Sequence, residues 1–188
     1  MMSDKPRVLV YAGPNGSGKS TITAGYPVTG TYINADEIKR FRDCTDLEAA
    51  QEAELLRESL LIARKDFTFE TVLSTDRNLN LLKKAKSLGY YIESIFVLTS
   101  DAELNVARVR ARVAKGGHSV PEDKIRSRCE KSLQLLKALA AISDVCTVVD
   151  NTVIPIIIYR KDEEGSALFQ NDFWDENSLS ELLTPANL

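Results

Sequence analysis

Eight residues near the N-terminus have the types and spacing of a polyphosphate-binding loop. They run Gly13-Pro14-Asn15-Gly16-Ser17-Gly18-Lys19-Ser20, a glycine, four residues and then Gly-Lys-Ser, which is the P-loop or Walker A pattern. Gly16 and Gly18 let the backbone turn tightly and bring its N–H groups against phosphate oxygens. Lys19 can reach the outer phosphates, and the Ser20 hydroxyl is placed to ligate Mg²⁺. The pattern predicts a nucleotide-binding protein.

The predicted nucleotide site extends one residue past this motif, and its predicted cofactors are ATP and Mg²⁺. The residues are Gly13, Pro14, Asn15, Gly16, Ser17, Gly18, Lys19, Ser20 and Thr21, with Ser20 also the metal ligand. The chain has no Asn-Lys-x-Asp guanine motif, which favours adenine. The alternative is a glycine-rich turn that binds nothing. The complete pattern between an apolar run and a helical segment argues against that alternative.

Asp36 is the first acid that could act on a second substrate. It lies just past an apolar segment that begins at Thr31 and is expected to be a strand. There a carboxylate can accept a proton from a substrate hydroxyl and orient that hydroxyl toward the γ-phosphorus of ATP. Asp36 could instead be an N-cap that satisfies the first N–H groups of a helix. The residue pattern leaves both interpretations open.

Glu70 is the second acid, and it interrupts an aromatic and β-branched segment that runs from residue 67 to residue 74. A buried carboxylate without a partner is costly. We therefore expect Glu70 to face a partner or a ligand at the end of a core strand. The alternative is a glutamate that points outward from an alternating strand.

An arginine cluster flanks the sequence Gly116-Gly117-His118. Its members are Arg108, Arg110, Arg112, Arg126 and Arg128. Arg108 and Arg112 are four residues apart and share a helical face, whereas Arg110 points elsewhere. A mobile segment with a glycine hinge can bring guanidinium groups over the phosphates and exclude water. The cluster therefore predicts a lid over approximately residues 101–130. A solvated basic face is the alternative for any single arginine.

Two further segments have less specific signals. His118 is the only histidine of the chain and is interpreted as a loop-shaping residue rather than a catalytic base. The segment Asp150-Asn151-Thr152 follows a late apolar run, so it could approach the nucleotide base. A simple turn explains that segment equally well.

Strands and helices alternate along the chain, which predicts an α/β fold with a mainly parallel sheet and helices on both faces. We expect one domain over residues 1–188 and about five or six strands. A capping box at Thr45 predicts a long helix. Its apolar face is expected to contain Ala49, Ala53, Leu56, Leu60 and Ala63. The expected strands cover residues 7–12, the segment from 31, and residues 67–74, 91–98, 145–149 and 154–159. Ligands of such sheets bind beyond the carboxyl ends of the strands.

Composition and charge exclude several functional classes. The net charge of −3 gives no basis for broad binding to nucleic acids or to anionic membranes. The three cysteines have no CxxC or CxxH spacing, so we expect reduced thiols rather than disulfides or metal ligands. No signal peptide is recognised at the N-terminus, and no apolar run approaches the ~20 residues of a membrane helix. A cytoplasmic location is expected.

Taken in order, these motifs resemble those of the zeta toxin family of P-loop kinases. The matching segments are Gly13 to Ser20, Ile33 to Glu37, Phe69 to Ser74, Arg112 to Pro121 and Ile125 to Arg128. The P-loop occurs in many families, but the ordered set is much more specific. The resemblance implies a P-loop NTPase fold with a helical lid, and a kinase that uses ATP and Mg²⁺. Its implied acceptor is the hydroxyl of a nucleotide sugar, such as UDP-N-acetylglucosamine.

The resemblance also assigns roles to individual residues. It implies that Lys19 binds the nucleotide phosphates, that Asp36 is the general base, and that Arg112 and Arg128 are catalytic lid arginines. Glu70 and Asn34 become substrate-binding residues. Members of the family are typically toxins that a partner protein holds inactive, which implies an antitoxin. Two alternatives stay open: a metabolite or antibiotic kinase of the same fold, and an ATP-dependent switch in which the acids Asp36 and Glu70 have no role.

Overall fold

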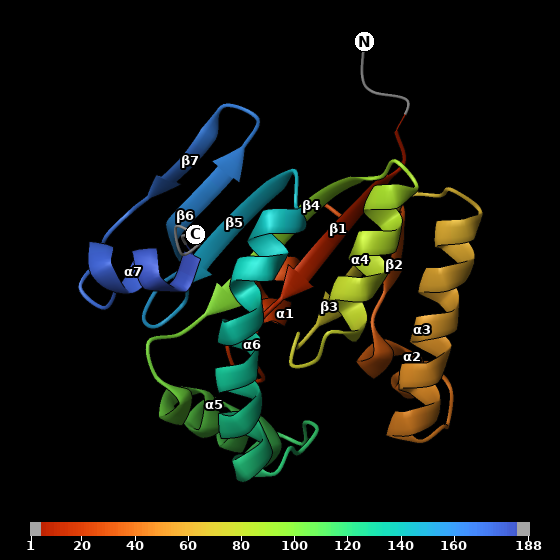
Figure 1. Ribbon diagram of the computed structural model, residues 1–188. Coiled ribbons are helices and arrows are strands. Elements are labelled where there is room, and N and C mark those ends of the chain that lie inside the picture. The colour runs from red at the N-terminus through yellow and green to blue at the C-terminus, as the bar shows by residue number, and fades with distance from the viewer. Residues whose placement is uncertain (1–4, 184–188) are drawn as a thin grey trace.

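The computed structural model describes residues 5–183 of the protein, so the N-terminal residues on which the absence of a signal peptide was predicted lie partly outside it. Its centre is a seven-stranded sheet in the order β2-β3-β1-β4-β5-β6-β7 (Figure 1). The strands are β1 (Arg7–Ala12), β2 (Thr31–Ile33), β3 (Phe67–Thr71), β4 (Tyr91–Leu98), β5 (Val145–Asp150), β6 (Ile156–Asp162) and β7 (Gly165–Leu168). The first five strands of this order are parallel, and β6 and β7 are antiparallel.

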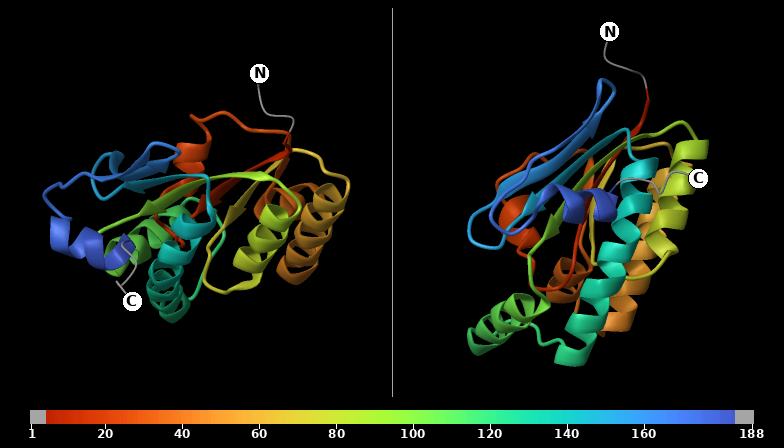
Figure 2. Two further views of the ribbon diagram at one scale, coloured as in Figure 1. Left: turned by 45° about the horizontal axis from the view of Figure 1, so that its top comes forward. Right: turned by 60° about the vertical axis from the view of Figure 1, so that its left-hand side comes forward.

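Helices cover both faces of the sheet, as predicted, but very unequally (Figure 2). The helices are α1 (Lys19–Thr23), α2 (Ala35–Phe41), α3 (Asp46–Ile62), α4 (Arg77–Ser87), α5 (Ala102–Ala114), α6 (Glu122–Ile142) and α7 (Glu176–Leu183). The larger core packs α3, α4, α6 and α7 against one face, to which β1 contributes Val8 and Val10. The alternate residues Leu9 and Tyr11 face a smaller cluster that includes Ile22 of α1.

The predicted number of five or six strands was too low because β7 was missed. The last expected strand ended at residue 159, yet β6 continues to Asp162 and β7 begins at Gly165. The sequence of β7, Gly-Ser-Ala-Leu, has little intrinsic preference for a strand. This edge strand forms because it pairs with β6, with Asp162 opposite Gly165 and Tyr159 opposite Leu168.

The buried face of α3 also differs from the expected one. Its capping box is present, because the Thr45 hydroxyl and the Glu48 carboxylate satisfy each other's backbone N–H groups. The buried residues of the helix are Ala49, Ala53, Arg57 and Leu61, whereas Leu56 is 38% exposed. The expected stripe was therefore wrong at Leu56, because Arg57 is the buried residue of that turn, and at Ala63, which is the exposed C-cap. Leu60 packs against the larger core, as expected.

The carboxyl ends of β1, β2 and β3 meet at one rim of the sheet. The parallel register places Tyr11 opposite Glu70 and Ala12 opposite Thr71, so the last residues of β3 lie beside the start of the P-loop. Strand β3 ends at Thr71, earlier than expected, because Leu73 adopts a left-handed conformation with φ 55° and its N–H donates to the Thr71 hydroxyl. This rim positions the predicted acids next to the predicted nucleotide site.

A helical arm projects beyond this rim (Figure 1). We use this term for residues 102–130, which comprise α5, the connecting loop and the first part of α6. Val106, Val109 and Ile125 form a small core between the two helices. Two ion pairs across the helices, Arg110 with Glu122 and Arg126 with Glu103, add to this contact.

Within residues 5–183, no helix has the length and apolar character needed to cross a membrane.

Candidate active site

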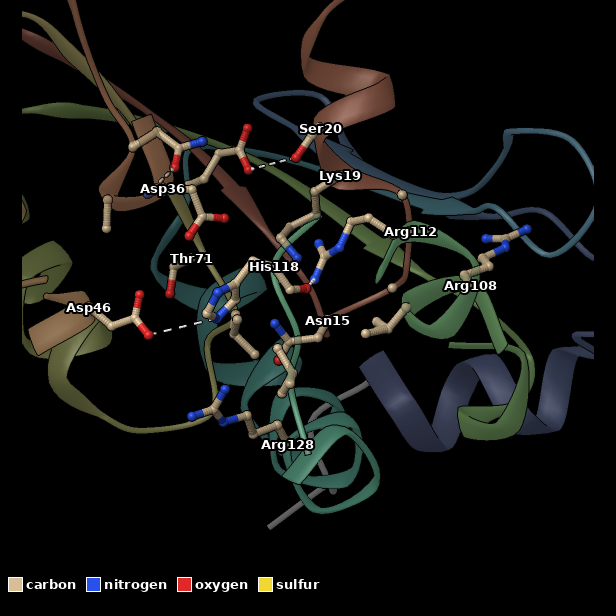
Figure 3. Close-up of a pocket in the computed structure, with 18 of the residues that line it drawn as sticks. Asn15, Lys19, Ser20, Asp36, Asp46, Thr71, Arg108, Arg112, His118 and Arg128 are labelled. Carbon is tan, nitrogen blue, oxygen red and sulfur yellow. Dashed lines mark hydrogen bonds and ion pairs between the residues drawn. The ribbon is translucent and has the colours of Figure 1, made fainter. Parts of the chain in front are cut away.

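A pocket of about 620 Å³ lies between the P-loop, α2, the start of α3, the end of β3 and the helical arm (Figure 3). It contains most of the residues predicted to bind nucleotide or substrate, although they come from segments far apart in the chain. Those lining it are Asn15, Gly16, Gly18, Lys19, Ser20, Thr21, Asn34, Asp36, Glu70, Arg112 and Arg128. Of the predicted site residues, Gly13, Pro14 and Ser17 do not line the pocket but shape the loop beneath it.

Lys19 is held at the base of the P-loop. Its ammonium group donates hydrogen bonds to the carbonyl oxygens of Gly13 at 2.6 Å and Pro14 at 2.9 Å. Burial lowers the pKa of Lys19 to about 8, although the carboxylates of Glu70 and Asp36 act in the opposite direction. The lysine charge is therefore costly in this environment and would be stabilised by anionic phosphates.

The two glycines at the ends of the loop are required by close contacts. Gly13 has φ 136°, and a Cβ there would lie 2.0 Å from the carbonyl oxygen of Val97. Gly18 has φ 92°, and its Cβ would lie 2.1 Å from Nδ2 of Asn151. The loop therefore passes against β4 on one side and against the segment after β5 on the other.

Asn151 fastens the P-loop from that second side. Its Nδ2 donates to the carbonyl oxygen of Ser17 at 2.8 Å. The neighbouring Asp150 is buried, and its carboxylate accepts from the Thr152 N–H and from Nδ2 of Asn171. The sequence left open whether this segment approaches the nucleotide or forms a simple turn. The structure places it against the back of the P-loop.

Asn34, rather than Asp36, is the N-cap of α2. The side-chain oxygen of Asn34 accepts from the Asp36 N–H at 2.9 Å, so the cap interpretation of the Asp36 carboxylate is wrong. Asp36 lies in the first turn of α2 and lines the pocket. Within the described part of the chain, no hydrogen bond or ion pair holds its carboxylate. It is thus available to accept a proton at the pocket surface.

Glu70 points into the pocket, where both of its carboxylate oxygens have partners. The Tyr32 hydroxyl donates to Oε1 at 2.6 Å, and the Ser20 hydroxyl donates to Oε2 at 3.4 Å. Nδ2 of Asn34 in turn donates to the Tyr32 hydroxyl at 3.1 Å. Burial and the bond to Glu70 raise the pKa of Tyr32. Glu70 therefore connects the P-loop to Tyr32 and, through it, to Asn34.

Tyr32 was not among the predicted site residues. A signal existed, because Tyr32 and Asn34 are two positions apart and residues so spaced on a strand share a face. Tyr32 fixes the orientation of Glu70 through its 2.6 Å bond.

The Ser20 hydroxyl and the Glu70 carboxylate fit the chemistry of Mg²⁺, which prefers oxygen ligands. Among residues 5–183, no group of three or more His, Cys, Asp or Glu side chains could hold a metal ion. A Mg²⁺ ion here would therefore be bound together with nucleotide phosphates, the usual arrangement for this ion in kinases.

The arginine cluster divides into two sets. Arg110 and Arg126 form the ion pairs that join α5 to α6, so the solvated interpretation holds for them. Arg108, Arg112 and Arg128 line the pocket.

These three lining arginines have different surroundings. Figure 3 shows Arg112 directed toward Lys19, while Arg108 is turned away and donates to the carbonyl oxygen of Thr152 at 2.9 Å. Arg112 also donates to the carbonyl oxygen of His118 at 2.9 Å. The guanidinium group of Arg128 has no hydrogen-bond or ion-pair partner among the residues that the structure describes. Arg112 and Arg128, the two predicted catalytic arginines, are thus the ones that face the cavity.

His118 and Asp46 were not predicted to belong to the site, yet both line the pocket. Nε2 of His118 lies 3.9 Å from Oδ2 of Asp46. This contact links the loop of the helical arm to the start of α3, on the far side of the cavity (Figure 3). The glycines beside His118 indicated a loop, but the sequence contains no signal for its partner on α3.

Comparison with protein families identifies the group to which these features belong. The zeta toxin model matches residues 1–172 of the chain. The chain belongs to the zeta toxin family. The predicted resemblance is therefore confirmed. A relative from Haemophilus influenzae, an uncharacterized protein, is 30% identical over 128 residues, which are 65% of this chain and 91% of that protein.

Solved structures show the same fold. One comes from the PezAT chromosomal toxin–antitoxin system of Streptococcus pneumoniae, with a TM-score of 0.62, 17% identity, and coverage of 100% of this chain and 82% of that one. Another is the AvrRxo1-ORF1:-ORF2 complex with ATP, with a TM-score of 0.72 and 14% identity, covering 96% of this chain and 64% of that one. The predicted P-loop fold, a mainly parallel sheet flanked by helices, is confirmed.

Proposed function

We propose that this zeta toxin family member is an ATP-dependent phosphotransferase whose acceptor is the hydroxyl of a small molecule. One observation carries the proposal. The P-loop residues Lys19 and Ser20, the unpaired carboxylate of Asp36, and the guanidinium groups of Arg112 and Arg128 all line a single cavity. Phosphoryl transfer needs positioned phosphates, positive charge and an oriented nucleophile, and these residues can supply each of them.

In the proposed reaction, Asp36 accepts the proton of the acceptor hydroxyl as the hydroxyl oxygen attacks the γ-phosphorus of ATP. The bond between that phosphorus and the β,γ-bridging oxygen breaks, and ADP leaves. Lys19 holds the phosphates, while Arg112 and Arg128 neutralise the charge on the transferring group. Mg²⁺, bound by Ser20 with Glu70 nearby, would contribute charge neutralisation at the phosphates.

A nucleotide sugar, with UDP-N-acetylglucosamine as its first example, is the proposed acceptor. Family membership supports this choice. Asn34 and Glu70 on the acceptor side of the cavity offer hydrogen-bonding groups suited to sugar hydroxyls. A metabolite or antibiotic bearing a hydroxyl is the second candidate within the same reaction class.

We propose further that the chain is one domain and that the helical arm acts as its lid. The arm supplies Arg112, His118 and Arg128 to the cavity, while the P-loop and Asp36 belong to the sheet rim. Closure of the arm would exclude water from the transferring phosphate. The contact between His118 and Asp46 joins the arm to the opposite wall and supports this role.

An antitoxin is the proposed protein partner. The support is the match to the zeta toxin family and the shared fold with the PezAT structure. Expression of the chain in bacteria is expected to slow growth, and the Lys19→Met variant is expected to be harmless. Equal growth of cells expressing the two forms would argue against a toxic activity.

The reaction is tested by measuring ADP release from Mg·ATP with and without UDP-N-acetylglucosamine, with the acceptor then examined by mass spectrometry. The expected result is acceptor-stimulated ADP release and a mass gain of one phosphate. If UDP-N-acetylglucosamine is inert, a panel of sugars, nucleosides and aminoglycosides locates the acceptor. Tight ATP binding with no stimulation by any member of the panel would contradict the proposal and favour an ATP-dependent switch.

A further inference from the structure

A second pocket, of about 170 Å³, lies between α3 and α4 and shares no lining residue with the first. Its lining is dominated by charged and amide side chains. They are Glu54, Arg57, Glu58, Arg77, Asn78, Asn80 and Lys84, together with Leu81. We propose that this pocket binds a small oxyanion such as inorganic phosphate. The inference does not depend on the nucleotide site.

The main evidence for an anion site is the environment of Arg57. Its side chain is among the buried charged groups, with a residue exposure of 9%. Its Nε is buried and has no hydrogen-bond partner, although the residue lines the pocket. The guanidinium carbon lies 5.2 Å from the ring centroid of Phe69, which is fully buried. The ring contact stabilises a cation but cannot accept from Nε in the plane of the guanidinium.

A buried charge without an acceptor is unusual, because buried charges are normally paired. Burial lowers the pKa of Arg57, and the nearby Arg77 acts in the same direction, whereas Glu54 and Glu58 oppose them. No carboxylate in the described part of the chain forms an ion pair with Arg57. An anion in the pocket would supply the missing counter-charge and an acceptor for the part of the guanidinium group that lines it.

The other charges of the pocket leave a positive excess. Glu54 is already paired with Arg77, with 3.1 Å between Oε2 and Nη1. The ammonium group of Lys84 has no ion-pair or hydrogen-bond partner within residues 5–183. Arg57 and Lys84 therefore face a single uncommitted carboxylate, that of Glu58. A guanidinium fork and an ammonium group together match the oxygens of a tetrahedral anion.

The volume limits the ligand to a small one. A water molecule occupies about 30 Å³ in the liquid, so a pocket of about 170 Å³ admits one small anion with a few waters. The pocket also lies close to the candidate active site. Nδ2 of Asn78 donates to the Thr71 hydroxyl at 2.7 Å, and Thr71 lines the larger cavity. An anion bound beside Asn78 would therefore be connected to the larger cavity through the contact between Asn78 and Thr71.

The test measures the Tm of the full chain at increasing concentrations of sodium phosphate. Sodium chloride keeps the ionic strength constant. The starting protein is the Lys19→Met variant, because that change weakens the P-loop as a competing phosphate site. Phosphate is expected to raise its Tm. Adding Arg57→Met is expected to weaken the phosphate affinity by at least about tenfold, the loss of a hydrogen bond to a charged group.

Two neighbouring lysines of α4 provide a matched pair. Lys84→Glu is expected to abolish the phosphate-dependent rise in Tm, and Lys83→Glu, one residue away and outside the pocket lining, is expected to retain it. Glu58→Gln is expected to strengthen binding. These surface changes keep the test valid if Arg57→Met fails to fold. Equal phosphate responses of the Lys84 and Lys83 variants, or no response beyond that to chloride, would overturn the proposal.

Discussion

The hydroxyl of Ser20 donates a hydrogen bond to the Glu70 carboxylate at 3.4 Å. This bond joins the P-loop to the end of β3, the strand that pairs with β1. Because Ser20 is the expected Mg²⁺ ligand of a P-loop, Glu70 lies next to the position proposed for the metal ion as well as beside the proposed acceptor site. The resemblance to the family had suggested only a substrate-binding role for this residue.

Glu70→Gln therefore has an expected effect on metal dependence. The variant keeps the size of the side chain but loses the charge that would attract Mg²⁺ or its bound water. We expect the Mg²⁺ concentration for half-maximal ATP binding to rise by about tenfold or more, while ATP affinity without metal stays unchanged. Calorimetric titration of ATP at several Mg²⁺ concentrations measures both quantities, with Glu37→Gln as the control. An unchanged Mg²⁺ dependence with a raised acceptor KM would restrict Glu70 to substrate binding.

Asn151→Ala is expected to weaken ATP binding although Asn151 does not line the cavity. Its Nδ2 holds the carbonyl oxygen of Ser17 at 2.8 Å, so its loss leaves the P-loop less ordered before phosphates bind. The expected loss in affinity is about five- to tenfold, the value of one hydrogen bond. Asn151→Asp should behave in the same way, because a carboxylate cannot donate to that oxygen. Full ATP affinity in both variants would contradict the role of this contact, and Asn177→Ala provides a control.

The pKa of Lys19 gives a pH dependence with a defined sign. Burial lowers this pKa from 10.5 to about 8 in the free protein, whereas bound phosphates favour the charged form. ATP affinity is therefore expected to be constant below pH 8 and to fall as the pH rises above it. Binding above pH 8 should take up protons, which calorimetry in buffers of different ionisation enthalpy detects.

The same shift affects folding stability in the opposite direction. The folded-state pKa of Lys19 lies below the unfolded value, so the unfolded chain binds more protons between pH 8 and 10.5. The contribution of Lys19 to the free energy of unfolding consequently rises with pH in that window. Denaturant titrations should show this rise in the native protein and its absence in Lys19→Met. For the prediction on ATP binding, an equal proton uptake at pH 6.5 and pH 9 would argue against a lowered pKa of Lys19 in the free protein.

Arg112 and Arg110 allow a comparison within one turn of α5. Arg112 faces the cavity, so Arg112→Ala is expected to lower kcat by about a hundredfold or more. Arg110 pairs with Glu122 at the exposed surface, so Arg110→Ala should leave both kcat and the thermal midpoint close to those of the native protein. Initial-rate kinetics distinguish the two, and similar losses of kcat would contradict the division of the arginine cluster.

Local patterns predicted the parts of the molecule that local chemistry determines. The P-loop is a contiguous motif, and the capping box at Thr45 is satisfied by residues three positions apart. The acids Asp36 and Glu70 were found because each follows or ends a strand at the ligand-binding rim.

The sequence could not show contacts that arise only when distant segments pack. Asn151 contacts Ser17 across 134 positions of the chain, and the partner of His118 lies on α3. Arg57 was missed for a different reason, since a charged residue inside an apolar stripe shifts the apparent helical periodicity toward Leu56. Strand β7 depends on its pairing with β6 rather than on its own residues.

The role of Asp36 as the general base is tested most directly by comparing the native protein with Asp36→Asn and Lys19→Met. For each, Mg·ATP affinity is measured by calorimetry, and phosphate transfer to UDP-N-acetylglucosamine, or to the acceptor found in its place, by mass spectrometry. We expect Asp36→Asn to bind ATP nearly as tightly as the native protein but to transfer no phosphate, and we expect Lys19→Met to be impaired in both. Continued acceptor phosphorylation by Asp36→Asn would contradict the assignment of Asp36 as the general base.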